Sequence, residues 1–198
     1  MFLHYKEFPS IGILSGTPGP LRQDTFNRGD TTDIGTPSDG GSAWEEIAGT
    51  GWGVTGNQGY DSSSGAGHIA VLESSNAIVS VRCTFNSVAG DGGDCGLVLR
   101  LSDSSNYIFL TFSESINYFA LTKIVAGVTT TLDVDTVDTA DGDVIRLEVT
   151  SGDVITVYQN DVERLTATDS FNSSATKHGL WANFDGQVRF ENFSIWAN

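Results

Sequence analysis

The sequence predicts an all-β fold, a two-sheet antiparallel β-sandwich of the jelly-roll type. Apolar and polar residues alternate along most of the chain, and no segment shows a convincing helical period. Glycine is abundant, with 23 residues in 198, and Ser, Thr, Asn and Asp gather between the apolar runs. That mixture is typical of many short strands joined by turns. A curved sandwich suits it because both sheets then share one apolar core.

The individual strands follow from the alternation. Strands are expected over 77–85, 95–101, 106–112, 117–124, 129–137, 143–150, 153–159, 163–169, 178–184 and 187–196. In the first of them Val79, Val81, Cys83 and Phe85 share one face. Ser151-Gly152 and Asn160-Asp161 stand where tight hairpins need residues that tolerate a left-handed backbone. Residues 169–176 leave room for one short helical turn.

The chain divides into an N-terminal arm, 1–22, and a single domain, 23–198. Proline and glycine are dense in the arm and disfavour regular structure. The arm also carries large apolar residues, which a solvated tail would not normally have: Phe2, Tyr5, Phe8, Ile11, Ile13 and Leu14. We interpret it as an extended docking arm that packs on its own domain, a sister subunit or a larger assembly. The alternative is a disordered tail.

Charge and composition exclude several classes of function. The net charge is −15, with only 10 Lys+Arg, and such a surface repels nucleic acid and anionic membranes. No run is long and apolar enough to span a bilayer. Lys6 and Glu7 interrupt the place where the apolar core of a signal peptide would lie. Cys83 and Cys95 are expected to be buried free thiols, and no cofactor is expected.

Two stretches resemble a known family. Asp24-Thr25-Phe26-Asn27-Arg28, Gly35, Trp44, Gly51-Trp52-Gly53-Val54 and Asn57-Gln58-Gly59-Tyr60 resemble the opening of concanavalin A-like lectin/glucanase domains of the laminin-G-like kind. Gly179-Leu180-Trp181 and Val188-Arg189-Phe190-Glu191-Asn192-Phe193 resemble their closing strands. The resemblance covers about residues 24–197 and implies the fold, which serves many unrelated functions. Such domains occur in bacterial surface proteins, carbohydrate-active enzymes and bacteriophage tail and surface proteins.

The tripeptide Arg28-Gly29-Asp30 is a known adhesion motif, but the resemblance places it at the exit of the first strand. There Phe26 is expected in the core, and Arg28 and Asp30 are expected to make local hydrogen bonds. A structural calcium ion is a second possibility in this chain. Its oxygen ligands would come from Asp24, Asp30 and Asp33, or from Asp91 and Asp94. Neither set matches an EF-hand or a calcium repeat, so no metal site is assigned.

Catalysis is not expected. Glucanases of this fold place their carboxylates as Glu-x-Asp-x-x-Glu, and glycoside hydrolysis needs a pair of them. The nearest stretch is Asp133-Val134-Asp135-Thr136-Val137-Asp138, which lacks glutamate, and Glu45-Glu46 would point apart on a strand. The histidines, His4, His68 and His178, lie in no nucleophile motif and are expected on the surface or in loops.

A glycan-binding face is the remaining candidate site. Saccharide sites combine aromatic rings with polar side chains. Trp52 is in phase with Val54 and is expected in the core. Strand alternation predicts that five other aromatic or cationic side chains point away from the core: Arg82, Arg100, Tyr107, Tyr118 and Trp181. These five are expected to line one sheet.

Two functions fit these observations. The first is a non-enzymatic virion surface protein of a bacteriophage, either a capsid decoration protein or a tail adhesin. It would be held to other virion proteins or sister subunits by the arm, in an oligomeric assembly, and would bind host cell-surface glycans. The domain resembles extracellular β-domains but has no recognisable export signal. A virion protein needs none, because host lysis releases the assembled particle. The alternative is a carbohydrate-binding module of an extracellular bacterial surface protein or glycoside hydrolase.

Overall fold

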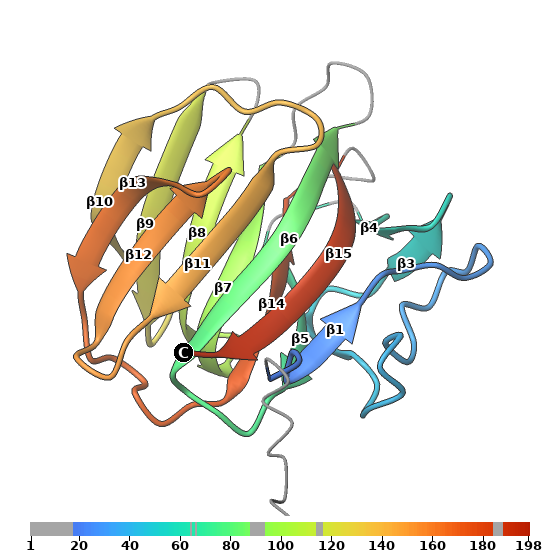
Figure 1. The fold of residues 1–198 in the computed structure, drawn as a ribbon, viewed down its shortest axis with the longest axis horizontal. Helices are drawn as coiled ribbons and strands as arrows, with labels where there is room; N and C mark the ends of the chain where they lie inside the picture. The colour runs from blue at the N-terminus through green and yellow to red at the C-terminus, as the bar shows by residue number, and fades with distance from the viewer. Residues whose placement is uncertain (1–17, 64, 66, 88–93, 114–116, 184–187) are drawn as a thin grey trace, which may run out of the picture.

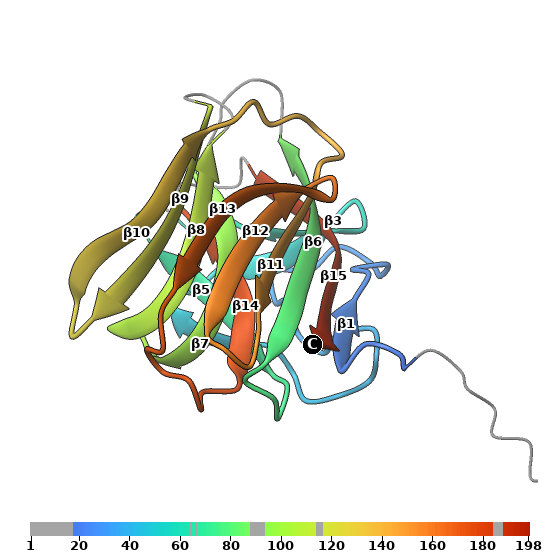
Figure 2. The same ribbon diagram turned by 60° about the vertical axis from the view of Figure 1, so that its left-hand side comes forward.

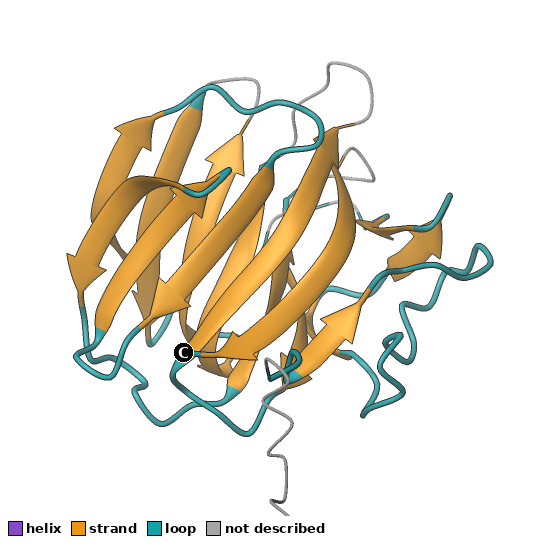
Figure 3. Cartoon of the chain, in the orientation of Figure 1, coloured by secondary structure: helices purple, strands orange, loops and turns teal. Residues whose placement is uncertain are grey.

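The computed structural model describes residues 18–63, 65, 67–87, 94–113, 117–183 and 188–198. Within these residues the chain forms fifteen strands and no helix (Figure 3). The strands are β1 (Arg22–Asp24), β2 (Glu45–Ala48), β3 (Trp52–Thr55), β4 (Gln58–Asp61), β5 (His68–Glu73), β6 (Val79–Ser87), β7 (Cys95–Asp103), β8 (Asn106–Ser113), β9 (Tyr118–Val125), β10 (Val128–Thr136), β11 (Val144–Val149), β12 (Val154–Gln159), β13 (Val162–Thr168), β14 (Lys177–Ala182) and β15 (Val188–Ala197). The described part of the chain contains no helix that could cross a membrane.

The strands form two antiparallel sheets that pack face to face, which confirms the predicted sandwich (Figure 1). The eight-stranded sheet has the order β13-β12-β11-β6-β15-β4-β3, and β1 also pairs with β15. The seven-stranded sheet has the order β10-β9-β8-β7-β14-β5-β2. Most neighbours are distant in sequence, because the chain crosses repeatedly between the sheets.

One apolar cluster fills the space between the sheets. The face predicted from the alternation in 77–85 lies in it, since Val79, Val81, Cys83 and Phe85 are all buried there. Phe26 and Trp52 are fully buried in the same cluster, as expected. Burial of apolar area on this scale is the main stabilising contribution to such a fold.

The two predicted hairpins exist, with one difference. Asn160 and Asp161 both have positive φ, at 51° and 63°, as a tight turn between β12 and β13 requires. In the other hairpin the left-handed residue is Asp153, at 58°, one position after the expected Ser151-Gly152 pair. The shift brings the carboxylate of Asp153 within 2.8 Å of the buried guanidinium of Arg100.

The short helical turn expected within 169–176 does not form; residues 171–174 make a hydrogen-bonded turn instead. Asp169 Oδ1 accepts a hydrogen bond from Phe171 N, and Asn172 has a φ of 51°. A residue in the left-handed region ends any helical continuation.

Candidate functional site

The five predicted glycan-binding residues do not lie on one sheet. Arg82 is on β6 of the eight-stranded sheet, whereas the other four are on β7, β8, β9 and β14 of the seven-stranded sheet. Strand phase shows which residues share a side of one strand, but it does not show which sheet the strand joins. The prediction of a single shared face is therefore wrong.

Arg100 was expected to point outward, and this is also wrong. It is 1% exposed and has a φ of 50°, at a bulge where the pairing of β7 with both of its neighbours shifts. The bulge reverses the phase of β7, so Leu101 reaches the outer face of the sheet and Arg100 turns inward. There its guanidinium binds Asp153 and the carbonyl oxygens of Ala77 and Asp169.

Tyr107 and Trp181 do lie together on the outer face of the seven-stranded sheet. Phe109 connects them, with ring centroids 5.3 Å from each. Both predicted residues are nearly covered, at 4% and 7% exposure, within a small apolar cluster. Tyr118 is half-buried at the opposite end of the β8–β9 pair from Tyr107. These rings therefore present little free face for a sugar.

An open groove lies on the outer face of the other sheet, where β1, β6 and β15 meet. A bulge in β15 sets its shape: Glu191 pairs with Thr84 and Ser194 pairs with Arg82, so one extra residue opposes Cys83. Asn192, with a φ of 52°, lies at the bulge. Beyond it, β1 lies beside β15 (Figure 2) and pairs with Phe193–Ile195. Gln23 of β1 and Thr25 just after it line the far wall of the groove. We call this hollow the bulge groove.

The bulge groove combines an aromatic ring, one cation and several neutral polar groups. It has a volume of about 340 Å³, at the lower end of the range of ligand sites, about 300–1,000 Å³. Trp196 is 36% exposed beside it, and its Nε1 donates to Ser194 Oγ at 3.0 Å, which orients the indole. Arg82 is also exposed. The lining residues are Gln23, Thr25, Arg82, Thr84, Asn192, Phe193, Ser194 and Trp196.

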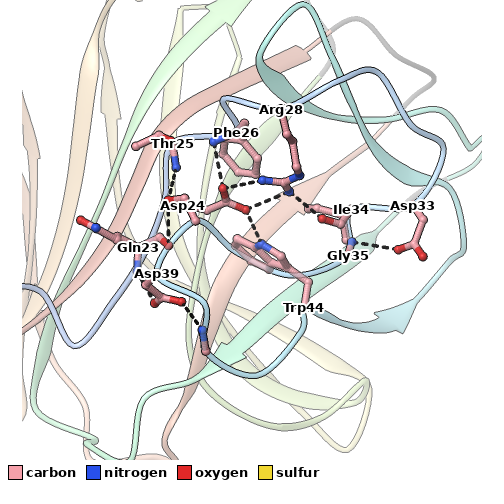
Figure 4. Close-up of polar contacts among 12 residues, drawn as sticks. Gln23, Asp24, Thr25, Phe26, Arg28, Asp33, Ile34, Gly35, Asp39 and Trp44 are labelled. Carbon is pink, nitrogen blue, oxygen red and sulfur yellow. Dashed lines mark hydrogen bonds and ion pairs between the residues drawn. The ribbon is translucent and has the colours of Figure 1, made fainter.

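A buried carboxylate anchors the β1 wall of the groove. Asp24 is fully buried, and its Oδ1 accepts hydrogen bonds from Phe26 N at 2.8 Å and Arg28 Nη1 at 2.7 Å. Its Oδ2 accepts from Arg28 Nη2 at 3.0 Å and Trp44 Nε1 at 2.8 Å (Figure 4). Arg28 Nη2 also donates to Ile34 O at 2.6 Å. Asp24 therefore ties the segment after β1 to the residues that precede β2.

This network decides the role of the Arg-Gly-Asp tripeptide. Arg28 is engaged with Asp24 and Ile34, and Asp30 accepts hydrogen bonds from Thr55 Oγ1 and Gly56 N. Arg28 makes the local hydrogen bonds that were expected, whereas Asp30 accepts its hydrogen bonds from residues 25 and 26 positions further along the chain. A receptor would have to break these contacts, so the tripeptide serves the fold.

The expected calcium ligands have separate hydrogen-bond partners. Asp24 and Asp30 bind the groups described above, and Asp33 Oδ1 accepts from Gly35 N (Figure 4). Asp91 lies outside the described residues, and Asp94 Oδ2 accepts from Asn183 at 3.5 Å. Within the described ranges no group of three or more His, Cys, Asp or Glu side chains could hold a metal ion.

Asp39 also stabilises β1, because its carboxylate accepts hydrogen bonds from Arg22 Nε and Gln23 N of that strand. Burial acts to raise its pKa, but hydrogen bonds from Gly41 N, Arg22 and Gln23 N, with the charge of Arg22, lower it overall. Arg22 also donates to the carbonyl oxygens of Glu73 and Ser42. Since Arg22 belongs to β1, the sandwich begins at the last residue of the expected arm, one residue before the expected start of the domain.

Two histidines are buried, contrary to the expectation of surface or loop positions. His68 Nδ1 lies 2.5 Å from Asp61 Oδ2, and this buried pair joins β5 of one sheet to β4 of the other. His178 is fully buried beneath the Arg100 bulge, and burial lowers its pKa to about 4. His4 lies outside the described residues.

The carboxylates considered for catalysis serve the fold in similar ways. Asp133, on β10, accepts from Thr166 N of β13 and from Val134 N. Glu45 forms an ion pair with Lys177 at 2.6 Å, and Glu46 accepts from Gly51 N. None of these carboxylates lines the bulge groove.

Both cysteines are buried thiols outside any disulfide, as expected. They lie on strands of different sheets, Cys83 on β6 and Cys95 on β7. Burial raises the pKa of the Cys83 thiol well above its usual range, so this thiol is protonated and unreactive.

Most of the bulge groove was not predicted from the sequence. Only Arg82 was singled out, while Trp196, Gln23, Asn192 and Ser194 were not. The outward positions of Ser194 and Trp196 could have been predicted from strand alternation. Phe193 and Ile195 are buried, so the residues between and after them point to the other face of the strand. Nothing local showed that β1 would pair beside them.

The fold is shared with proteins of known structure. The carbohydrate-binding module CBM66 from Bacillus subtilis superposes with a TM-score of 0.65 at 20% identity, covering 78% of this chain and 95% of that one. The chain has a concanavalin A-like jelly-roll fold. A protein of unknown function with a galectin-like fold from Bacillus subtilis gives a TM-score of 0.65 at 11% identity, over 90% of this chain and 96% of that one.

An enzyme also contains this jelly roll. The glycoside hydrolase family 43 protein BlXynB from Bacillus licheniformis superposes with a TM-score of 0.68 at 13% identity, over 89% of this chain. The match spans only 39% of that protein. At these identities the likeness establishes the fold and leaves function to the site. No family model and no curated protein matches the sequence.

Proposed function

We propose that this chain is a non-enzymatic carbohydrate-binding domain that holds a saccharide in the bulge groove. The observation that carries the proposal is the exposed indole of Trp196 beside Arg82, above a groove lined by amides and hydroxyls. A sugar ring has an apolar face that packs on an aromatic ring and hydroxyls that pair with planar polar groups. A protein of this fold that is named as a carbohydrate-binding module supports the proposal.

The groove favours binding over hydrolysis. Glycoside hydrolysis requires two carboxyl groups that flank the bond to be cleaved. The residues that line the bulge groove include no carboxylate. A bound saccharide would therefore be held without acid–base chemistry.

Replacing Trp196 with alanine should weaken saccharide binding about tenfold or more, because tryptophan is enriched among the binding residues whose truncation costs about 2 kcal/mol or more. Binding would be measured on a glycan array and then by titration with the strongest hit. Val128→Ala is the control, since Val128 is an exposed apolar residue on β10, far from the groove. Equal binding by the wild-type and Trp196→Ala proteins would contradict the proposed site.

Tryptophan fluorescence offers a second readout. The chain has four tryptophans, and Trp44, Trp52 and Trp181 are buried. A saccharide on Trp196 should therefore protect the wild-type protein from acrylamide quenching, and this protection should vanish in Trp196→Ala. Protection that persists in the variant would place the ligand elsewhere.

Attachment to a virion through the N-terminal arm is a separate part of the proposal. Phe2, Tyr5, Phe8, Ile11, Ile13 and Leu14 lie outside the described residues. Leu21, just before β1, is 38% exposed, and its backbone N donates a hydrogen bond to Ile195 O of β15 in the eight-stranded sheet. An arm leaving from this edge suits docking onto a neighbouring subunit. Placement on a virion surface, with virion proteins as partners, stays a prediction.

Removing residues 1–17 should convert an oligomer into a folded monomer if the arm is an attachment device. The shortened chain starts at Pro18 so that Arg22 keeps its contacts with Asp39, Glu73 and Ser42. Mass from light scattering is the readout, and the thermal unfolding midpoint verifies folding. Two monomers with the same glycan binding would instead favour a free carbohydrate-binding module.

A further inference from the structure

The bulge groove has an unusual charge for this protein. The chain carries 25 acidic residues against 10 basic ones. Even so, the groove is lined by one arginine and by no carboxylate. The residues that line the groove therefore carry a positive charge, whereas the chain as a whole carries a negative one.

Arg82 differs from most basic residues in the described part of the chain. Carboxylate partners within ion-pair distance are found for Arg22, Arg28, Arg100, Lys123, Arg146 and Lys177. Arg82 is exposed, and no described carboxylate lies within that distance of it. Its five N–H donors are therefore available to a ligand.

The residue opposite Arg82 on the neighbouring strand supplies no counter-charge to it. Arg82 on β6 is directly opposite Arg146 on β11, and like charges in that arrangement are destabilising. Arg146 is stacked on Tyr158 at 3.8 Å and forms ion pairs with Glu148 and Asp161. Arg146 is thus held by its own partners, while Arg82 faces the groove with its charge uncompensated.

We propose that Arg82 selects saccharides that carry an anionic group, a carboxylate or a sulfate. This inference rests on the proposed glycan-binding function and names the ligand class of the same groove. The planar guanidinium fork matches both oxyanions with two parallel hydrogen bonds. The amides of Gln23 and Asn192 and the hydroxyls of Thr25, Thr84 and Ser194 then pair with the sugar hydroxyls.

The experiment is a glycan array with matched sets of neutral, uronate-containing and sulfated oligosaccharides, probed with the full chain. Binding should concentrate on the anionic members, and the hits separate carboxylate from sulfate ligands. The strongest anionic hit is then titrated beside its carboxyl-reduced or desulfated counterpart. Arg82→Gln should weaken binding of the anionic form about tenfold, because hydrogen bonds to charged groups are strong but the groove is open to water. It should weaken binding of the neutral form much less, because only the anionic form places a charged group on the guanidinium.

Arg164→Gln is the matched control. Arg164 is an exposed arginine on β13, away from the groove, so this substitution makes the same change in net charge. A tenfold loss in both variants would mean that only overall charge matters, and it would overturn the role of Arg82. Neutral hits alone, with Trp196→Ala abolishing them, would overturn the anionic class and keep the glycan function. No hit in any set would overturn both proposals.

Discussion

Replacing Asp24 with asparagine should lower the free energy of unfolding by about 3 kcal/mol. Asp24 is fully buried and accepts four hydrogen bonds, two from the guanidinium of Arg28 and one each from Phe26 N and Trp44 Nε1. Removing one partner of a buried ion pair costs about 3–5 kcal/mol because the other charge stays without compensation. We expect the lower end, since the Arg28 side chain is 25% exposed and water solvates it in part.

Urea unfolding followed by fluorescence measures this loss, with Asp30→Asn as the control. Asp30 is exposed, and among the described residues its hydrogen-bond donors are Thr55 and Gly56. Its replacement should therefore cost less than about 1 kcal/mol. Similar losses in the two variants would show that the Asp24 network does not hold the segment between β1 and β2. Because β1 forms one wall of the bulge groove, Asp24→Asn should also weaken saccharide binding.

The second large effect concerns pH and His178. Its Nε2 donates to Asn76 O at 2.9 Å, and its Nδ1 accepts from Arg100 N at 3.2 Å, so the buried ring is neutral. Burial lowers its pKa from 6.5 to about 4, against the opposing effects of the Asn76 hydrogen bond and the Glu73 charge. Between these values the unfolded chain binds a proton that the folded chain does not.

Stability from His178 is therefore fully present above pH 6.5 and is lost as the pH falls towards 4. The interval corresponds to about 3 kcal/mol. Unfolding free energies of the wild type and His178→Gln should be measured from pH 7.5 to 4. The wild-type curve should fall more steeply, because only the wild type has a buried imidazole that must bind a proton on unfolding. Parallel curves would show that His178 does not contribute to the pH dependence.

Much of the fold follows from local pattern. The alternation in 77–85 places Val79, Val81, Cys83 and Phe85 in the core, and Asn160-Asp161 forms the expected turn with positive φ at both residues. Both features depend on the two-residue period of a strand or on the backbone preferences of single residues. The resemblance of the first and last strands to concanavalin A-like domains identified the architecture that joins them.

The candidate site depended on information that no single segment holds. Arg100 is the clearest case, since alternation predicts an outward side chain and a bulge turns it towards Asp153 on the other sheet. The groove is likewise lined both by Asn192 at the β15 bulge and by Gln23 of β1, which pairs with β15 beyond the bulge. Tyr107 and Trp181 do point outward but are covered by their own neighbours.

The sequence by itself determined that the chain is a β-sandwich, that its surface is acidic and that Phe26, Trp52 and both cysteines belong to the core. The tertiary structure decided which sheet each strand joins, where bulges reverse the phase, and which aromatic ring stays exposed. The physical reason is one of range. Side-chain alternation and turn preference act over a few residues, whereas strand order and coverage arise from pairing between segments as far apart as β1 and β15.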